Sequence, residues 1–155
     1  MSQIKSSTLT FLQNNVDRRK NCMYTCLQIA FEAKINLVLF QEPWISSNNQ
    51  FTISHSSFYC ILPEDTQYRP RVVIYARKNS RFQVNIRSDL STDGDFLVID
   101  IRDQQNRLNT VQLVNIYNEK SLREDESRWT AQRCLLDYKP TKYTIITGDL
   151  NAHHL

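Results

Sequence analysis

Four residues with oxygen-bearing side chains follow hydrophobic segments of the sequence, at the points where these segments end. They are Asn15, Glu42, Asp149 and Asn151, and the hydrophobic segments before them are 9–13, 37–41 and 144–147. Asp149 and Asn151 are two positions apart, so both lie on one side of an extended chain. Carboxylate and carboxamide oxygens are hard ligands, which suit Mg²⁺ or Mn²⁺ rather than zinc. Such an ion polarises a phosphoryl oxygen, so the pattern indicates phosphate-ester hydrolysis.

Each of these residues also has a purely structural interpretation. Asn15 has the composition of a turn residue, Glu42 precedes Pro43 and has that of an exposed loop acid, and residues 148–151 have a common turn composition. The shared position at the ends of buried strands favours the site. The carboxyl ends of neighbouring strands gather at one edge of an α/β sheet, where ligands usually bind.

Seven strands and two helices are expected to position these residues. The strands are predicted at 8–13, 35–41, 71–77, 82–86, 96–102, 110–117 and 143–147, and the helices at 18–34 and 124–138. Asp17 is the expected N-cap of the first helix, and an acidic start suits the dipole of the second. The order predicts a parallel βαβ unit followed by an antiparallel block, which together form a mixed α/β sandwich.

The composition is that of a folded globular domain. The chain has 155 residues, of which 41% are hydrophobic and 23% charged, which argues against disorder, collagen-like repetition and a coiled coil. The longest uncharged apolar run, 35–40, is too short to cross a bilayer, and the N-terminus lacks a signal-peptide core. The four cysteines have neither zinc-site nor disulfide-framework spacing. We therefore expect a nuclear or cytoplasmic protein that is not secreted and has no membrane partner.

Positive charge is concentrated in one segment of the chain. Residues 66–88 contain six Lys and Arg residues and no Asp or Glu, in a chain whose net charge is +3. Such a cluster suits a polyanion, because binding to phosphates releases counterions. The alternative is a hairpin whose long side chains are only solvated. The candidate nucleic-acid contacts in this segment are Arg71, Arg77, Lys78 and Arg81.

Four segments of the sequence carry a family resemblance. They are residues 11–18 (FLQNNVDR), 41–45 (QEPWI), 114–118 (VNIYN) and 148–154 (GDLNAHH). In this order they resemble the motifs of the endonuclease/exonuclease/phosphatase superfamily, whose members include DNase I-like enzymes. Within it, the sequence is most similar to the N-terminal endonuclease domain of non-LTR retrotransposons. Each motif is weak alone, and the four together cover almost the whole chain.

The resemblance implies a fold and a role for each motif residue. The fold would be a four-layer α/β/β/α sandwich formed by residues 8–155, after an N-terminal extension of residues 1–7. Asn15 and Glu42 would hold Mg²⁺ or Mn²⁺, Tyr117 would contact the phosphate, Asp149 would orient or deprotonate the attacking water, and Asn151 would bind a phosphate oxygen. His153 and His154 fit the retrotransposon form of the last motif and are assigned as further nucleic-acid contacts. The implied activity is nicking of double-stranded DNA, with a reverse transcriptase in the parent polyprotein as a partner.

The sequence departs from the superfamily pattern after its fourth motif. The family continues to an Asp and an Asp-His pair, whereas this chain ends at Leu155. We therefore expect about the N-terminal two-thirds of the domain, with its C-terminal part missing and its activity reduced. Two alternatives stay open at this point: a catalytically inactive remnant that binds DNA or has no function, and a phosphatase of the same superfamily that acts on a lipid or small phosphoester.

Overall fold

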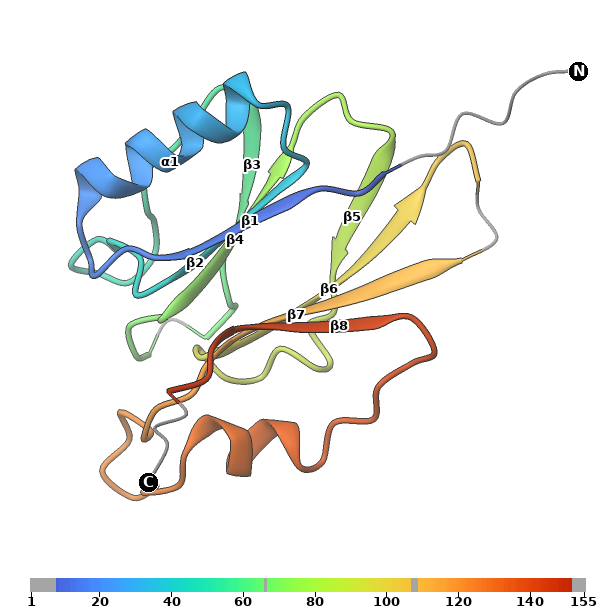
Figure 1. Ribbon diagram of the computed structural model, residues 1–155. Coiled ribbons are helices and arrows are strands. Elements are labelled where there is room, and N and C mark those ends of the chain that lie inside the picture. Colours follow the sequence, from blue (N-terminus) through green and yellow to red (C-terminus); the bar gives the residue numbers. More distant parts are fainter. Residues whose placement is uncertain (1–7, 66, 107–108, 152–155) are drawn as a thin grey trace, which may run out of the picture.

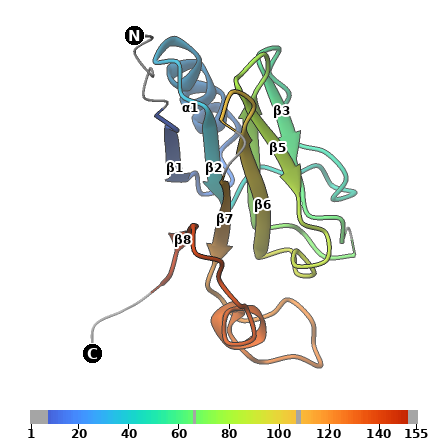
Figure 2. The same ribbon diagram turned by 90° about the vertical axis from the view of Figure 1, so that its right-hand side faces the viewer.

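Two four-stranded sheets pack face to face in the computed structural model, which describes residues 8–65, 67–106 and 109–151 (Figures 1 and 2). The first sheet has the strand order β1-β2-β4-β3 and the second the order β5-β6-β7-β8. The strands are β1 (Phe11–Asn15), β2 (Leu37–Gln41), β3 (Phe58–Ile61), β4 (Val72–Arg77), β5 (Phe82–Ile86), β6 (Phe96–Asp103), β7 (Thr110–Tyr117) and β8 (Thr144–Asp149). The helices are α1 (Lys20–Glu32) and a short π-helix (Ala131–Leu135).

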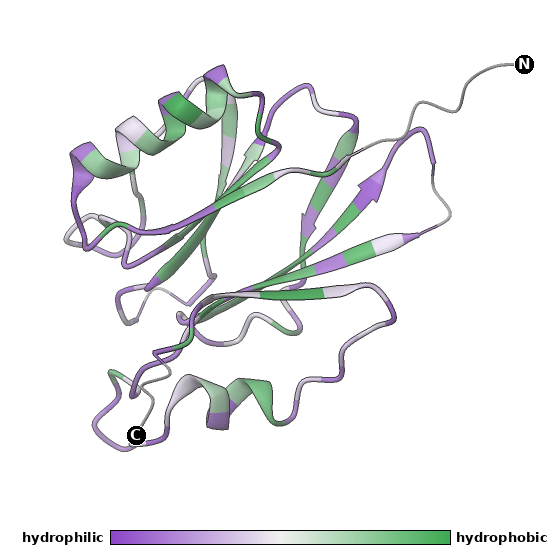
Figure 3. Cartoon of the chain, in the orientation of Figure 1, coloured by the Kyte–Doolittle hydropathy of each residue, from purple (hydrophilic) through white to green (hydrophobic). Residues whose placement is uncertain are grey.

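The hydrophobic residues form three clusters, one for each interface between layers. α1 packs on the outer face of the first sheet through Met23, Leu27 and Ala30 (Figure 1). A second cluster fills the space between the sheets, and a third joins the second sheet to the π-helix segment. The strands are accordingly hydrophobic through the middle of both sheets (Figure 3). The predicted α/β/β/α sandwich is confirmed, with a thin helical layer on the second sheet.

Parallel pairing brings the ends of four strands to one edge of the molecule. β1 pairs with β2 in parallel, so that Asn15 lies opposite Gln41, as predicted for a βαβ unit. β7 pairs with β8 in parallel, so that Tyr117 lies opposite Asp149. We call the edge formed by the carboxyl ends of β1, β2, β7 and β8 the carboxyl rim. The candidate site residues Asn15, Glu42, Tyr117, Asp149 and Asn151 lie at this rim or directly after it.

The prediction that Asp17 is the N-cap of the first helix is wrong. α1 begins at Lys20, and the cap residue Arg19 makes no side-chain capping bond. Asp17 and Arg18 instead have left-handed backbones, with φ of 48° and 57°. Their backbone N–H groups bond to residues of the carboxyl rim: Asp17 N–H donates to Asn15 Oδ1 at 3.0 Å, and Arg18 N–H donates to the Glu42 carbonyl at 2.7 Å. The turn before the helix is thus tied to two candidate site residues.

Two other elements differ from the expectation. The strand β3 was not predicted. It is only four residues long, and residues 52–57 before it are rich in Ser and Thr, which is typical of a loop, although its aromatic residues pair with β4. The second helix was predicted to begin near Glu124, but only the five-residue π-helix forms. The preceding segment is held near β7 instead: Lys120 bridges to Trp129, and Thr130 N–H donates to the Glu119 carbonyl at 3.0 Å. These bonds compete with helix formation.

Two further expectations concern the chain as a whole. All four cysteines are free, in agreement with their spacing. Within the described residues, no helix is both long enough and apolar enough to cross a membrane.

Amide side chains connect the two sheets in the interior. Gln41 and Asn115 are fully buried, and Gln41 Nε2 donates to Asn115 Oδ1 at 2.6 Å. Asn115 Nδ2 donates to the carbonyls of Phe40 at 3.2 Å and Val73 at 3.1 Å. One side chain of β7 therefore satisfies polar groups on both β2 and β4. Because buried polar groups need partners, this contact fixes how the sheets sit on each other.

We predict that Asn115→Ala lowers the free energy of unfolding by about 3 kcal/mol, because it leaves the buried Gln41 amide without its acceptor and removes the side-chain hydrogen bonds to the Phe40 and Val73 carbonyls. Asn85→Ala on the exposed side of β5 is the matched control and should change stability by less than about 0.5 kcal/mol. Urea denaturation followed by circular dichroism measures both. Equal midpoints for Asn115→Ala and the unmodified chain would contradict the role of this contact.

Candidate active site

Asn15, Glu42 and Asp149 meet at the carboxyl rim. Asn15 Nδ2 lies 3.0 Å from Asp149 Oδ2 and 3.3 Å from Glu42 Oε2. Asn15 and Asp149 are 134 positions apart in the sequence and belong to different sheets. Two carboxylates therefore converge on one amide group, which donates to both of them.

Glu42 holds an unusual backbone conformation at the end of β2. Its φ is 46°, which costs a residue with a side chain about 1–3 kcal/mol unless its surroundings impose it. Bonds on both sides impose it here: Glu42 N–H donates to the Arg71 carbonyl at 2.9 Å, and the Glu42 carbonyl accepts from Arg18 N–H. The carboxylate lies 3.5 Å from the Arg18 guanidinium and is mostly shielded from solvent. The turn thus aims this carboxylate across the rim.

The segment after β8 is held to the end of β7 by Asn118. Asn118 N–H donates to the Asp149 carbonyl and its side-chain amide to the Leu150 carbonyl, at 2.8 and 2.9 Å. Asn151 closes the loop, because its side chain donates to the Asn118 carbonyl at 2.8 Å and its N–H to Asp149 Oδ1 at 3.0 Å. The sequence interpretation did not assign a role to Asn118, although this residue follows Tyr117 in the third motif.

Tyr117 lies between the two sheets with its ring almost buried. Burial raises the pKa of its phenol, and the negative charge of Glu42 raises this pKa further. The Asn151 side chain also interacts with the phenol group. The hydroxyl group therefore stays neutral at physiological pH and remains a hydrogen-bond donor at the rim.

A buried ion pair lies beneath Tyr117. The Arg71 guanidinium sits 5.1 Å from the centre of the Tyr117 ring and forms a two-point contact with Asp95, with Nε to Oδ1 at 2.8 Å. Burial alone would lower the pKa of Arg71, but the hydrogen bond and charge of Asp95 outweigh burial and raise it. Asp95 also accepts Tyr117 N–H through its carbonyl at 2.9 Å. The pair therefore holds both the ring and the backbone of Tyr117.

The donor atoms at the rim fit a hard divalent cation. Asn15 and Glu42, the predicted ligands, lie together, and Asp149 adds a second carboxylate. No group of three or more His, Cys, Asp or Glu side chains with the geometry of a metal site occurs in the described ranges. The oxygen donors that meet here are the carboxylates of Glu42 and Asp149, with the Asn15 side-chain amide between them. Such a set suits Mg²⁺ or Mn²⁺ and leaves positions for water and substrate.

The predicted basic contacts do not form one surface. Arg71 is at the rim but is buried in its ion pair. Arg77, Lys78 and Arg81 lie at or beyond the far end of β4, away from the rim, because β4 is antiparallel to β2. Arg77 donates to three backbone carbonyls at the end of α1 and before β2, and Arg81 pairs with Asp103. His153 and His154 lie outside the described residues, so their assignment stays a prediction.

The fold matches two solved structures over nearly the whole chain. The endonuclease domain of TRAS1, a telomere-specific non-LTR retrotransposon, aligns with a TM-score of 0.68 and 21% identity, covering 95% of this chain and 61% of that one. A humanized D. rerio TDP2 with 14 mutations aligns with a TM-score of 0.61 and 20% identity, covering 96% of this chain and 65% of that one. This chain therefore spans less than two-thirds of either solved chain.

At such low identity the likeness establishes the fold alone, and this fold is the α/β/β/α sandwich predicted from the sequence. No protein-family model and no curated protein sequence matches the chain. The roles of individual residues therefore rest on the geometry of the rim.

Gly148 precedes Asp149 in β8 and has a φ of 141°, and a Cβ atom there would lie 1.9 Å from the Ile116 carbonyl oxygen. We predict that Gly148→Ala lowers the free energy of unfolding by about 3 kcal/mol or more, because β8 must move away from β7. Gly94 is the other glycine of the chain, and a Cβ atom there would come no closer than 3.4 Å to its neighbours. Gly94→Ala should cost about 1 kcal/mol or less. Equal urea midpoints for the two variants would contradict the prediction.

Proposed function

We propose that this chain carries the site of a divalent-metal-dependent phosphodiesterase that nicks double-stranded DNA. The observation that supports it most strongly is the convergence of Asn15, Glu42 and Asp149 on one point of the carboxyl rim. In this proposal Asn15 and Glu42 hold Mg²⁺ or Mn²⁺. When bound, the ion would polarise the phosphoryl oxygen and stabilise charge on the leaving oxygen.

Three other residues of the rim act on the attacking water and on the phosphate group. Asp149 accepts a proton from the water that attacks phosphorus, while the bond to the leaving sugar oxygen breaks. One side-chain N–H of Asn151 donates to the Asn118 carbonyl, and the other, which lies beside the Tyr117 phenol, donates to a non-bridging phosphate oxygen when the substrate is bound. The neutral Tyr117 phenol donates to the same phosphate group, where negative charge increases in the transition state.

The fold likeness supports DNA as the substrate and a mobile element as the source. The matched TRAS1 domain is an endonuclease domain of a non-LTR retrotransposon. By this analogy we propose that residues 8–155 belong to an endonuclease domain, preceded by the extension 1–7, that acts inside the cell and is followed by a reverse transcriptase in the parent polyprotein.

Relaxation of supercoiled plasmid tests the proposal directly. We expect open-circular DNA to form with Mg²⁺ or Mn²⁺ and not with EDTA. Asp149→Asn should lower the rate by about 10²–10⁴-fold, because it removes the group that accepts the proton. Asp137→Asn is the matched control, since Asp137 is exposed on the outer layer and should leave the rate unchanged.

Three results would contradict the proposal. Nicking that persists in EDTA would exclude the metal, and full activity of Asp149→Asn would exclude its role. No nicking above buffer with either ion would show that this chain does not catalyse the reaction. Release of phosphate from inositol phosphates without nicking would assign the rim to a phosphatase.

A further inference from the structure

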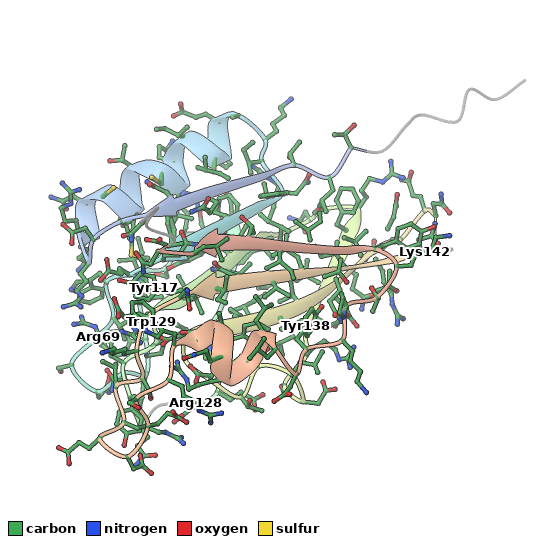
Figure 4. The ribbon with its side chains drawn as sticks, turned by 60° about the horizontal axis from the view of Figure 1, so that its bottom comes forward. Arg69, Tyr117, Arg128, Trp129, Tyr138 and Lys142 are labelled. Carbon is green, nitrogen blue, oxygen red and sulfur yellow. The ribbon has the colours of Figure 1, made fainter. Side chains whose placement is uncertain are left out.

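A small polar cavity opens beside the candidate active site. Its volume is about 90 Å³, enough for about three water molecules or one small anion. Its walls come from Tyr68 and Arg69 before β4, from residues 93–95 before β6, and from residues 121–123 after β7. Figure 4 shows Arg69 and Tyr117 at the same end of the molecule. The cavity therefore continues the carboxyl rim beyond Tyr117 and the buried Arg71–Asp95 pair.

Arg69 holds a donor that nothing in the described part of the chain accepts. Its Nη2 donates to the Ile45 carbonyl at 3.2 Å, which fixes the orientation of the guanidinium. Its Nε atom is buried and has no hydrogen-bond partner among the described residues. An unpaired buried donor costs free energy, above all on a charged group, so native structures rarely keep one without a reason. The position of this nitrogen points to a ligand that is bound during function.

The charges around the cavity indicate the sign of that ligand. Each carboxylate of the cavity wall has an arginine partner. The pairs are Asp65–Arg123 at 3.5 Å, Asp93–Arg133 at 2.9 Å, Glu126–Arg128 at 2.7 Å, and Asp95 with both Arg71 and Arg133. Arg69 forms no ion pair with any carboxylate in the described ranges. The wall thus presents neutralised acids and one uncompensated guanidinium, which suits an anion.

We propose that the Arg69 cavity binds a backbone phosphate of the DNA strand that lies across the carboxyl rim. This inference rests on the proposed function and extends it by one phosphate subsite. A guanidinium binds phosphate oxygens through two N–H groups in a fixed plane, and Nε is one of these groups. The cavity takes the phosphate that neighbours the one held at Asp149 and Asn151, and Arg69 sets the register of the strand. Free inorganic phosphate has the same chemistry and is the competing source.

Fluorescence anisotropy with a short fluorescein-labelled DNA duplex in EDTA tests the subsite without catalysis. Arg69→Gln should weaken binding on the order of tenfold and lower the slope of log Kd against log salt by about one. Arg69→Lys keeps the charge and should restore the slope but not the affinity, because lysine lacks the planar pair of donors. Arg102→Gln is the matched control: Arg102 is exposed on β6 near the far end of the second sheet and should change neither quantity.

The outcomes separate the subsite from the nuclease proposal. If Arg69→Gln and Arg69→Lys both bind the duplex as the unmodified chain does, with the same salt slope, the subsite is rejected. If inorganic phosphate binds only when Arg69 is present, yet duplex affinity does not depend on Arg69, the cavity is a free-anion site and the DNA assignment fails. If plasmid is not nicked but Arg69→Gln still weakens the duplex, catalysis fails and the subsite stands. Cooperative urea unfolding of both variants shows that they are folded, and if Arg69→Gln is not, Arg69→Lys decides.

Discussion

The hydrogen bonds of Asn115 are the constraint on which the candidate site depends. The two carboxylates and Tyr117 come from different sheets, and hydrophobic packing alone does not fix how two sheets slide on each other. Asn115 accepts from Gln41 and donates to the carbonyls of Phe40 and Val73, so its position on β7 is fixed relative to β2 and β4. Gln41 precedes Glu42 and Asn115 lies two residues before Tyr117. A slip between the sheets would therefore break buried hydrogen bonds before it separated the site residues.

The second constraint is the buried pair of Arg71 and Asp95, which joins the start of β4 to the start of β6. Removing one partner of such a pair costs about 3–5 kcal/mol, because the other charge is left buried. Arg71 also donates to the Lys120 carbonyl at 2.7 Å, and Thr130 donates to the Tyr117 carbonyl at 2.7 Å. Tyr117 is thus held through its ring, its N–H and its carbonyl, all by groups outside the motifs. These contacts explain why a short loop segment replaces the longer helix that the sequence favours.

The sequence was informative where local pattern and topology coincide. Strands that end just before Asn15, Glu42 and Asp149 were predicted from the sequence, and parallel pairing within each sheet brings the ends of these strands to one edge. The sequence showed where basic residues are concentrated but not which partners they have in the fold. Arg71 and Asp95 are 24 positions apart, and nothing in a run of basic residues shows that one member is buried with a carboxylate. Asn118 was missed for the same reason: its bonds reach Leu150 and Ala131, far along the chain. Partners that are distant in sequence set the roles of polar residues, whereas hydrophobic periodicity is set locally.

The left-handed residues at the rim connect these constraints to the proposed chemistry. Glu42 and Asn151 have φ of 46° and 44°, and each follows the end of a strand whose partner also ends at the rim. A chain that turns so sharply leaves its strand at once, so the side chain is presented at the edge instead of continuing the alternation of the sheet. Hydrogen bonds to other segments sustain the strain: Arg71 and Arg18 hold the backbone of Glu42, and the Asn118 carbonyl accepts from the Asn151 side chain. Two carboxylates can then face each other with only the Asn15 amide between them, and their repulsion is the electrostatic reason that a cation would be favoured there.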